Sequence, residues 1–227
     1  MGASIALPAL GANDRINVSI TGLRGRGRDH ISQFAKFREA RIAAVCDVDS
    51  AQVERAVALV EKLTGAKPKT YRDFRQMLDD KEIDAVTVAT CNHWHALQAV
   101  WACQAGKDVY LEKPASHNIW EGRRAVEAAR KYKRIVQVGM QSRSIAHKRR
   151  AIELLRQGVI GKVYMARGIC FKRRKSIGKQ PDGPVPPGVD FNAWLGPAPL
   201  RPFNPNRFHY NWHWFWDTGN GDIGNQG

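Results

Sequence analysis

The stretch that decides the fold is residues 108–114, which read DVYLEKP. Its apolar centre, VYL, is typical of a strand inside a parallel sheet, because such strands are covered on both faces. Pro114 ends the strand, and the bond before it can be cis, which would aim the preceding amine into a cleft. Parallel sheets bind ligands beyond the carboxyl ends of their strands, so Glu112 and Lys113 are candidate functional residues. A surface ion pair in a loop explains these residues equally well.

Strands and helices alternate on both sides of this stretch. Alternation of strands with helices of about 10 to 15 residues is typical of a parallel sheet with right-handed crossovers. The fold class we expect is therefore α/β, a doubly wound parallel sheet of the Rossmann kind. The expected strands are 15–21, 41–46, 85–89, 109–111 and 135–139. The expected helices are 31–37, 51–63 before Gly65, 73–78, 95–104 before Gly106, and the segment from the Asn118 cap to Lys131.

A glycine-dense turn, GLRGRG, follows the first expected strand. The dinucleotide fingerprint GxGxxG uses its glycines for a tight turn, for close approach to the pyrophosphate and for helix packing. Gly22 and Gly27 take its first and third places, but Arg24 holds the second, where its charge can meet the pyrophosphate. A phosphate loop of another kind is the alternative. The candidate cofactor-binding residues of this turn are Gly22, Leu23, Arg24, Gly25, Arg26 and Gly27.

Asp47 follows the second expected strand, 20 residues after Gly27. In dinucleotide-binding domains an acidic side chain at about this spacing accepts hydrogen bonds from the adenosine ribose. Its charge repels a 2′-phosphate, which predicts NAD as the cofactor in preference to NADP. A helix N-cap is the alternative role for this carboxylate.

The chain of 227 residues has 36 basic and 21 acidic residues, a formal net charge of +15. Such a charge permits phosphate-bearing ligands, nucleic acid or anionic surfaces as partners. The basic clusters at 24–28, 147–150 and 172–175 lack the interleaved aromatic residues of a nucleic-acid platform. We therefore expect a small-molecule substrate and no nucleic acid. The length admits one α/β domain and part of a second.

Four cysteines, Cys46, Cys91, Cys103 and Cys170, form no CxxC pair, which predicts buried thiols in place of a zinc or redox site. The apolar segment 1–14 resembles the second half of an export signal without its basic start. We expect a cytoplasmic chain as given, or an exported one if the true start carries a complete signal. No other segment reaches the ~20 apolar residues of a membrane span, so no membrane association is expected.

Five motifs along the chain are typical of one family: GLRGRG (22–27), CDVD (46–49), ATCNHWHA (89–96), LEKP (111–114) and VGMQSRS (138–144). Together they resemble the glucose-fructose oxidoreductase, inositol dehydrogenase and MocA (Gfo/Idh/MocA) family. The resemblance covers the chain from Arg15 onward, and LEKP is its most specific part. It implies an NAD-dependent oxidoreductase acting on a CH–OH group of a sugar or polyol, homo-oligomeric at full length. Cys91 stands where the family usually has proline, which bears on loop rigidity.

The resemblance also implies roles for individual residues. Lys113 is implied to be catalytic, positioning and polarising the reacting hydroxyl, and Glu112 to lie beside the nicotinamide ribose. The chemistry of an amine agrees, because burial and a nearby cofactor charge lower its pKa toward neutrality. The further cofactor-binding candidates are Thr90, Asn92, His95 and Gln141, and the substrate-binding candidates are Arg143, His213 and Trp214.

No metal site is predicted from the two histidines of the third motif. His93 and His95 are two residues apart, and side chains at that spacing on a helix point to different faces. We therefore expect the two histidines to have different contacts and not to bind one metal ion together.

The composition changes after Gln141, and we place a domain boundary near Ser142. The expected domains are a cofactor-binding domain, 15–141, and an incomplete α+β substrate domain, 142–227. Within the latter a basic helix is expected at 146–157 and a strand at 162–171.

The segment 211–217, NWHWFWD, would place its three tryptophans on one face if it were extended. Indole faces suit the C–H faces of pyranose rings. A hydrophobic cover over the sheet of the second domain is the interpretation we prefer slightly.

Residues 219–227, GNGDIGNQG, resemble the beginning of a family segment that supplies the remaining catalytic groups. Asn225 takes the place of its usual acid, and the expected histidine would fall beyond Gly227. We therefore predict a truncated second domain and a chain that binds NAD but is inactive by itself. Two alternatives stay open: an NAD-dependent glycosidase of the same fold, which oxidises a ring hydroxyl transiently, and a non-catalytic dinucleotide-binding module.

Overall fold

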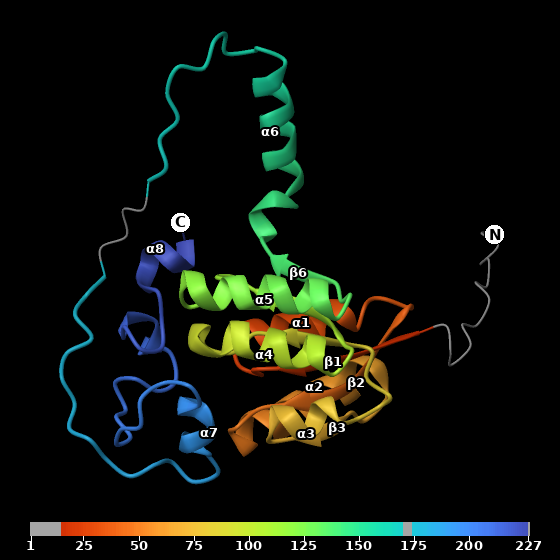
Figure 1. Ribbon diagram of the computed structural model, residues 1–227, viewed down its shortest axis with the longest axis vertical. Coiled ribbons are helices and arrows are strands. Elements are labelled where there is room, and N and C mark those ends of the chain that lie inside the picture. The colour runs from red at the N-terminus through yellow and green to blue at the C-terminus, as the bar shows by residue number, and fades with distance from the viewer. Residues whose placement is uncertain (1–14, 170–173, 227) are drawn as a thin grey trace.

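The computed structural model describes residues 15–169 and 174–226 (Figure 1). The predicted N-terminal segment, 1–14, and Cys170 lie outside the described residues. Within the described part of the chain, no helix has the length and apolar character needed to cross a membrane.

Six strands form one sheet in which every neighbouring pair is parallel, in the order β3-β2-β1-β4-β5-β6. This confirms the predicted doubly wound α/β sheet. The short strand β3 was not predicted, because its three residues, KTY, bury no apolar side chain and carry no periodic pattern. The strands are β1 (Ile16–Thr21), β2 (Ala40–Cys46), β3 (Lys69–Tyr71), β4 (Ala85–Val88), β5 (Asp108–Glu112) and β6 (Val136–Gly139).

Helices cover both faces of the sheet, and each face has its own apolar core. On one face, Ile31 and Val60 from the first two helices pack against Ile20 and Val45 of the sheet. On the other face, helices α3 to α5 close over a larger core that includes Val86 and Leu111, and α4 and α5 lie side by side (Figure 1). The helices are α1 (Arg26–Phe34), α2 (Ser50–Thr64), α3 (Phe74–Leu78), α4 (Asn92–Gln104) and α5 (Ile119–Lys131).

The helix ends follow the signals in the sequence. The Asn118 side chain accepts a hydrogen bond from the backbone N–H of Glu121, which confirms the predicted cap of α5. Gly65 ends α2 with φ 72°, a left-handed conformation that glycine adopts without steric cost. Asp49 caps α2 by accepting from the N–H of Ala51, so the helix cap near the second strand is Asp49 and not Asp47.

After β6 the described chain contains helices and irregular segments but no further strand. The strand predicted at 162–171 is wrong for residues 162–169; the last two lie outside the described residues. An isolated strand leaves its backbone groups without partners, and no described strand lies beside this segment, where Tyr164 is 91% exposed. The elements are the 3-10 turns η2 (Gln141–Arg143) and η3 (Asn211–Trp214) and the helices α6 (Ala146–Arg156), α7 (Phe191–Leu195) and α8 (Gly221–Gln226).

The C-terminal part of the chain folds back against the carboxyl edge of the sheet, whereas α6 projects away from it (Figure 1). An aromatic cluster of Phe191, Trp194 and Phe203 packs there against Cys91, which precedes α4. Backbone hydrogen bonds join the same regions, since the N–H of Asp190 donates to the carbonyl of Val48 (2.9 Å). Apolar packing and backbone pairing therefore hold this part in place together.

The segment 211–217 is not extended, which corrects the expectation that its tryptophans share one face. Residues 211–214 form η3, a 3-10 turn that rotates successive side chains to different directions. Trp212 packs against the aromatic cluster, whereas Trp216 is 95% exposed.

This arrangement predicts unequal contributions of two tryptophans to stability. Trp194→Ala removes a buried indole and should lower the free energy of unfolding by about 3–5 kcal/mol. Trp216→Ala, the control, should change it by no more than about 0.5 kcal/mol. Urea denaturation followed by circular dichroism measures both, and equal midpoints for the two variants would contradict the docking of this cluster.

Candidate functional site

A cavity of about 1350 Å³ opens at the carboxyl edge of the sheet, between the glycine turn and the C-terminal part of the chain. It brings together most of the residues predicted from the sequence. Leu23, Gly27, Arg143 and Trp214 are not among its lining residues. The predicted residues that line it are Gly22, Arg24, Gly25, Arg26, Asp47, Thr90, Asn92, His95, Glu112, Lys113, Gln141, His213 and Asn225.

The glycines at the two ends of the turn leave no room for side chains. Gly22 has φ +78°, and a Cβ there would lie 2.6 Å from the carbonyl carbon of Ala89. A Cβ on Gly27 would lie 1.9 Å from the carbonyl oxygen of Gly22. Leu23 buries its side chain in the core, and the exposed side chain of Arg24 extends from the same turn. The backbone thus passes close to β4 and enters α1 directly.

Asp47 connects this turn to the end of β2. Its Oδ2 accepts a hydrogen bond from the N–H of Leu23 (2.7 Å), and its Oδ1 accepts one from the N–H of Asp49 (3.0 Å). Burial raises the pKa of Asp47 to about 6, although the two N–H donors oppose the shift. Each carboxylate oxygen has a second lone pair, so the group can still accept a donor from the cavity.

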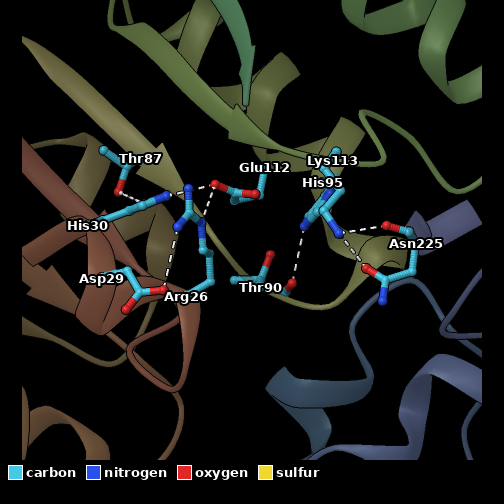
Figure 2. A network of polar contacts seen from close by, with 9 residues as sticks. All are labelled: Arg26, Asp29, His30, Thr87, Thr90, His95, Glu112, Lys113 and Asn225. Atoms are coloured by element: carbon cyan, nitrogen blue, oxygen red, sulfur yellow. Dashed lines mark hydrogen bonds and ion pairs between the residues drawn. The ribbon is translucent and has the colours of Figure 1, made fainter. Parts of the chain in front are cut away.

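A buried carboxylate joins the start of α1 to the end of β5, as Figure 2 shows. Glu112 accepts hydrogen bonds at Oε1 from Nε of Arg26 (2.8 Å) and from Nε2 of His30 (2.9 Å). Burial would raise the pKa of Glu112, but the bonds from His30 and Arg26 outweigh it and leave that pKa below its usual value. His30 was not predicted from the sequence. Its position one helical turn after Arg26 indicates that the two side chains share a face of α1, and this could have identified it.

Lys113 lies next to this network and points toward the C-terminal helix α8 (Figure 2). Its peptide bond to Pro114 is cis. The Nζ atom donates to the backbone carbonyl oxygen of Asn225 (2.7 Å) and to its side-chain Oδ1. Burial lowers the pKa of the Lys113 amine, with the charge of Arg26 acting in the same direction and that of Glu112 opposing it. The two residues predicted as catalytic are therefore in direct contact.

His95 shapes the loop that carries this lysine. It is 2% exposed, and its ring nitrogens lie 2.6 Å from the carbonyl oxygen of Pro114 and 3.1 Å from that of Thr90. Burial lowers the pKa of His95, so the neutral ring donates to one carbonyl, and the shorter distance favours Pro114.

His93 has different partners from His95, the carbonyl oxygens of Trp194 (3.1 Å) and Thr218 (3.3 Å). The described residues contain no group of three or more His, Cys, Asp or Glu side chains placed to hold a metal ion.

Two residues that were not singled out from the sequence, Asn220 and His209, make three contacts at or beside the cavity. Asn220 accepts a hydrogen bond from Nδ2 of Asn92 (2.9 Å) and donates to the carbonyl of His117 (2.7 Å). His209 lines the cavity and pairs with Asp49 (3.0 Å). All three contacts join segments more than a hundred residues apart, so no local pattern in the sequence marks them.

Comparison with protein families agrees with this geometry. Residues 16–140 match the family described as "Oxidoreductase family, NAD-binding Rossmann fold", and residues 148–227 match "Oxidoreductase family, C-terminal alpha/beta domain". The chain belongs to the Gfo/Idh/MocA oxidoreductase family. Its cofactor is NAD, and its second part matches the C-terminal α/β domain of the family. The predicted domain boundary near Ser142 stays a prediction.

Curated relatives match a limited part of the chain. It is similar to an alpha-N-acetylgalactosaminidase of Shewanella oneidensis, with 32% identity over 103 residues that cover 44% of this chain and 22% of that protein. It is also similar to a glycosyl hydrolase family 109 protein of Shewanella sp. strain W3-18-1, with 31% identity over 105 residues that cover 44% and 23%. The chain thus matches less than a quarter of the length of these relatives.

Solved structures cover more of the chain. A scyllo-inositol dehydrogenase from Lactobacillus casei, solved with bound NAD(H) and scyllo-inositol, is similar with a TM-score of 0.58 and 29% identity over 65% of this chain and 42% of that one. A myo-inositol 2-dehydrogenase from Lactobacillus plantarum has a TM-score of 0.60 and 26% identity over 66% and 43%. The chain therefore spans less than half of these Gfo/Idh/MocA structures.

The crowding at the turn predicts that Gly22 is indispensable. Gly22→Ala adds a Cβ that collides with backbone and forces alanine into a left-handed conformation. Gly65→Ala, the control, has a similar φ of +72° but open space around the new Cβ. The control should cost only the conformational strain, roughly 1–2 kcal/mol. The Gly22 variant should be less stable than the control and lose NAD binding, as measured by thermal unfolding and titration calorimetry. Equal NAD affinity in both variants would contradict the close approach.

Proposed function

We propose that this protein is an NAD-dependent oxidoreductase that acts on a CH–OH group of a sugar or polyol. The observation that carries the proposal is the amine of Lys113, which lies at the end of β5 in the same cavity as the glycine turn. In open parallel sheets, ligands bind at this edge. A cofactor seated on the turn and a substrate hydroxyl beside the amine would meet there.

The residues of the turn fit a dinucleotide pyrophosphate. Gly22 and Gly27 give the backbone the close passage that such a group needs, and the N-terminus of α1 supplies N–H groups and a positive dipole. Arg24, exposed at the cavity wall, adds a cationic side chain. Asp47 would accept hydrogen bonds from the hydroxyls of the adenosine ribose and repel a 2′-phosphate.

Lys113 would orient and polarise the reacting oxygen. Its lowered pKa makes the amine a better proton donor and acceptor near neutrality than a free lysine. Glu112, held by Arg26 and His30, would fix the end of β5 beside it. NAD supplies the hydride chemistry when it is bound.

The substrate class is supported by the inositol dehydrogenases, one of which was solved with scyllo-inositol. The curated relatives support the alternative activity, that of a glycosidase, and a role restricted to dinucleotide binding is the third candidate function. Accumulation of reduced NAD separates them, because the glycosidase returns the hydride to its substrate and a binding module produces none.

The raised pKa of Asp47 predicts a pH-dependent affinity for NAD. Ribose hydroxyls donate to an ionised carboxylate, so affinity should be near its maximum about one pH unit above the Asp47 pKa of about 6 and decline as the pH falls through that value and Asp47 takes up a proton. Asp47→Asn should flatten this dependence. Asp47→Ala should cost about 1–3 kcal/mol of binding free energy.

Titration calorimetry between about pH 5 and 8 measures these affinities, given the pKa of about 6 for Asp47. Asp79→Asn, an exposed carboxylate outside the cavity, should leave affinity and its pH dependence unchanged. Equal affinity of the unsubstituted chain for NAD and NADP would refute the role of Asp47.

The position of Lys113 predicts a separation of catalysis from binding. In a protein extended to a complete second domain, Lys113→Ala should slow single-turnover reduction of NAD by scyllo-inositol by roughly 10² to 10⁴, the usual range for acid–base assistance, while NAD affinity changes little. Lys36→Ala, an exposed residue outside the cavity, is the control. Absorbance of the reduced nicotinamide reports the rate, and an unimpaired Lys113 variant would place the chemistry elsewhere.

A further inference from the structure

A second cavity, of about 450 Å³, lies in the C-terminal part of the chain. It shares none of its described lining residues with the cavity at the carboxyl edge of the sheet, here called the cofactor cavity. Three basic side chains and one carboxylate line it: those of Lys179, Arg201, Arg207 and Asp182. The proposed function uses none of these four residues. A cavity in which cations outnumber carboxylates favours a negatively charged ligand.

Buried polar atoms without partners gather at this cavity. Among the described residues, four buried side-chain nitrogen or oxygen atoms have no hydrogen-bond partner, and three of them belong to Arg201, Arg207 and Asp217. Buried polar groups are normally paired, because an unpaired donor has lost its hydrogen bonds to water without replacement. Two of the three atoms are the Nε donors of the arginines that line the cavity. A ligand that accepts hydrogen bonds would satisfy them.

Arg207 is the donor best placed for such a ligand. It is 5% exposed, and its Nη1 donates to Oδ1 of Asp217 (2.6 Å). The ring of Phe215 covers one face of the guanidinium, with its centroid 4.0 Å from Cζ. The remaining edge, formed by Nε and Nη2, makes no hydrogen bond to a described residue. That edge carries the pair of parallel donors with which arginine binds phosphate and carboxylate groups.

The charges around Arg207 are not balanced. Asp217 faces Arg207 through Oδ1 and Arg201 through Oδ2, so one negative charge serves two positive charges. Lys179, an exposed residue, adds a third cation to the cavity wall. Asp182 on the same wall offsets only part of this charge. An anion bound in the cavity would neutralise the excess.

Side-chain amides hold the walls of this cavity together. Nδ2 of Asn204 donates to the carbonyl oxygen of Gln180 (2.9 Å), and Nδ2 of Asn206 donates to that of Gly178 (2.7 Å). The segment that carries Lys179 is thereby fixed against the segment that carries the two arginines. The cations therefore converge on a space that is formed before any ligand arrives.

We propose that this second cavity binds a phosphate group, whose oxygens accept hydrogen bonds from Nε and Nη2 of Arg207. Arg201 and Lys179 would supply further positive charge. The phosphate is either the free ion or part of a small phosphorylated molecule, since the cavity recognises the same group in both. Binding involves no covalent step and does not depend on the proposed oxidoreductase activity.

Titration calorimetry of the 227-residue chain with inorganic phosphate tests the proposal, with NAD in excess so that the glycine turn is occupied. Saturable binding of one phosphate per chain should persist, and chloride at equal ionic strength should not replace it. Methyl phosphate distinguishes the two sources, because tighter binding than that of the free ion indicates a phosphorylated molecule and weaker binding indicates the ion. Displacement of phosphate by NAD, or the absence of saturable binding, would overturn the proposal.

Substitutions locate the bound phosphate. Arg207→Lys keeps a positive charge facing Asp217 but removes the paired donors, and it should weaken phosphate binding roughly tenfold to a hundredfold. Lys179→Ala, at an exposed position, should weaken it roughly two- to fivefold. Lys36→Ala, exposed and outside both cavities, is the control and should bind phosphate like the unsubstituted chain. Equal affinity in all these proteins, or an equal loss in the control, would mean that phosphate responds only to overall charge.

Nitrogen-15 NMR of the arginine side chains observes the site in the unsubstituted chain, so it decides the proposal even if Arg207→Lys does not fold. The Nε–H resonance of Arg207 should shift as phosphate is added in the presence of NAD. The Nε–H of Arg26, which donates to Glu112 in the cofactor cavity, should not shift. A shift at Arg26 without one at Arg207 would place the anion in the cofactor cavity and refute the second site.

Discussion

The structure depends on the buried carboxylate of Glu112. A charge out of contact with water is tolerated only when donors surround it, and removing one partner of such a group typically costs about 3–5 kcal/mol. Arg26 and His30 supply the donors from α1, and Thr87 on β4 supports the ring of His30 (3.2 Å). The end of β5 and the start of α1 are thereby locked together, although they are far apart in the sequence.

The hydrogen bonds of Glu112 also fix the position of Lys113, the candidate catalytic residue. Because Glu112 is fixed, Lys113 leaves the sheet at a defined point, and His95 holds the next residue by its hydrogen bond to the Pro114 carbonyl. The glycine turn approaches from the other side, tied to β2 through Asp47. The cofactor turn and the amine therefore face one cavity because two carboxylates connect them: Asp47 binds the turn to the end of β2, and Glu112 binds the helix α1 to the end of β5.

The strands and helices of the sheet domain were predicted from local sequence patterns, whereas the structure of the region after β6 was not. The predictions rested on apolar runs, helix periodicity, the Asn118 cap and Gly65. Each of these features lies within one short stretch of sequence, so it can be recognised without knowing the tertiary structure. The predicted strand at 162–171 failed for its described residues because a strand requires a neighbour that the sequence of the strand cannot specify. The tryptophans of 211–217 were misplaced for a related reason: a 3-10 turn in that segment is favoured by packing of Trp212, which propensity does not encode.

The sequence by itself determined the sheet, the glycine turn, Asp47 and the lysine of LEKP, because these rest on residue types at fixed local spacings. Only the tertiary structure decided that Glu112 is held by His30, that Asn220 reaches Asn92, and that His213 joins the cavity with its Nδ1 beside the Tyr210 carbonyl. Each of these contacts links segments whose approach is set by chain topology, or, for His213, by the way the loop between Tyr210 and Gly219 closes on itself. The hydrogen-bond partners, burial and tautomer of a side chain depend on residues that only folding brings together, so they cannot be predicted from the local sequence.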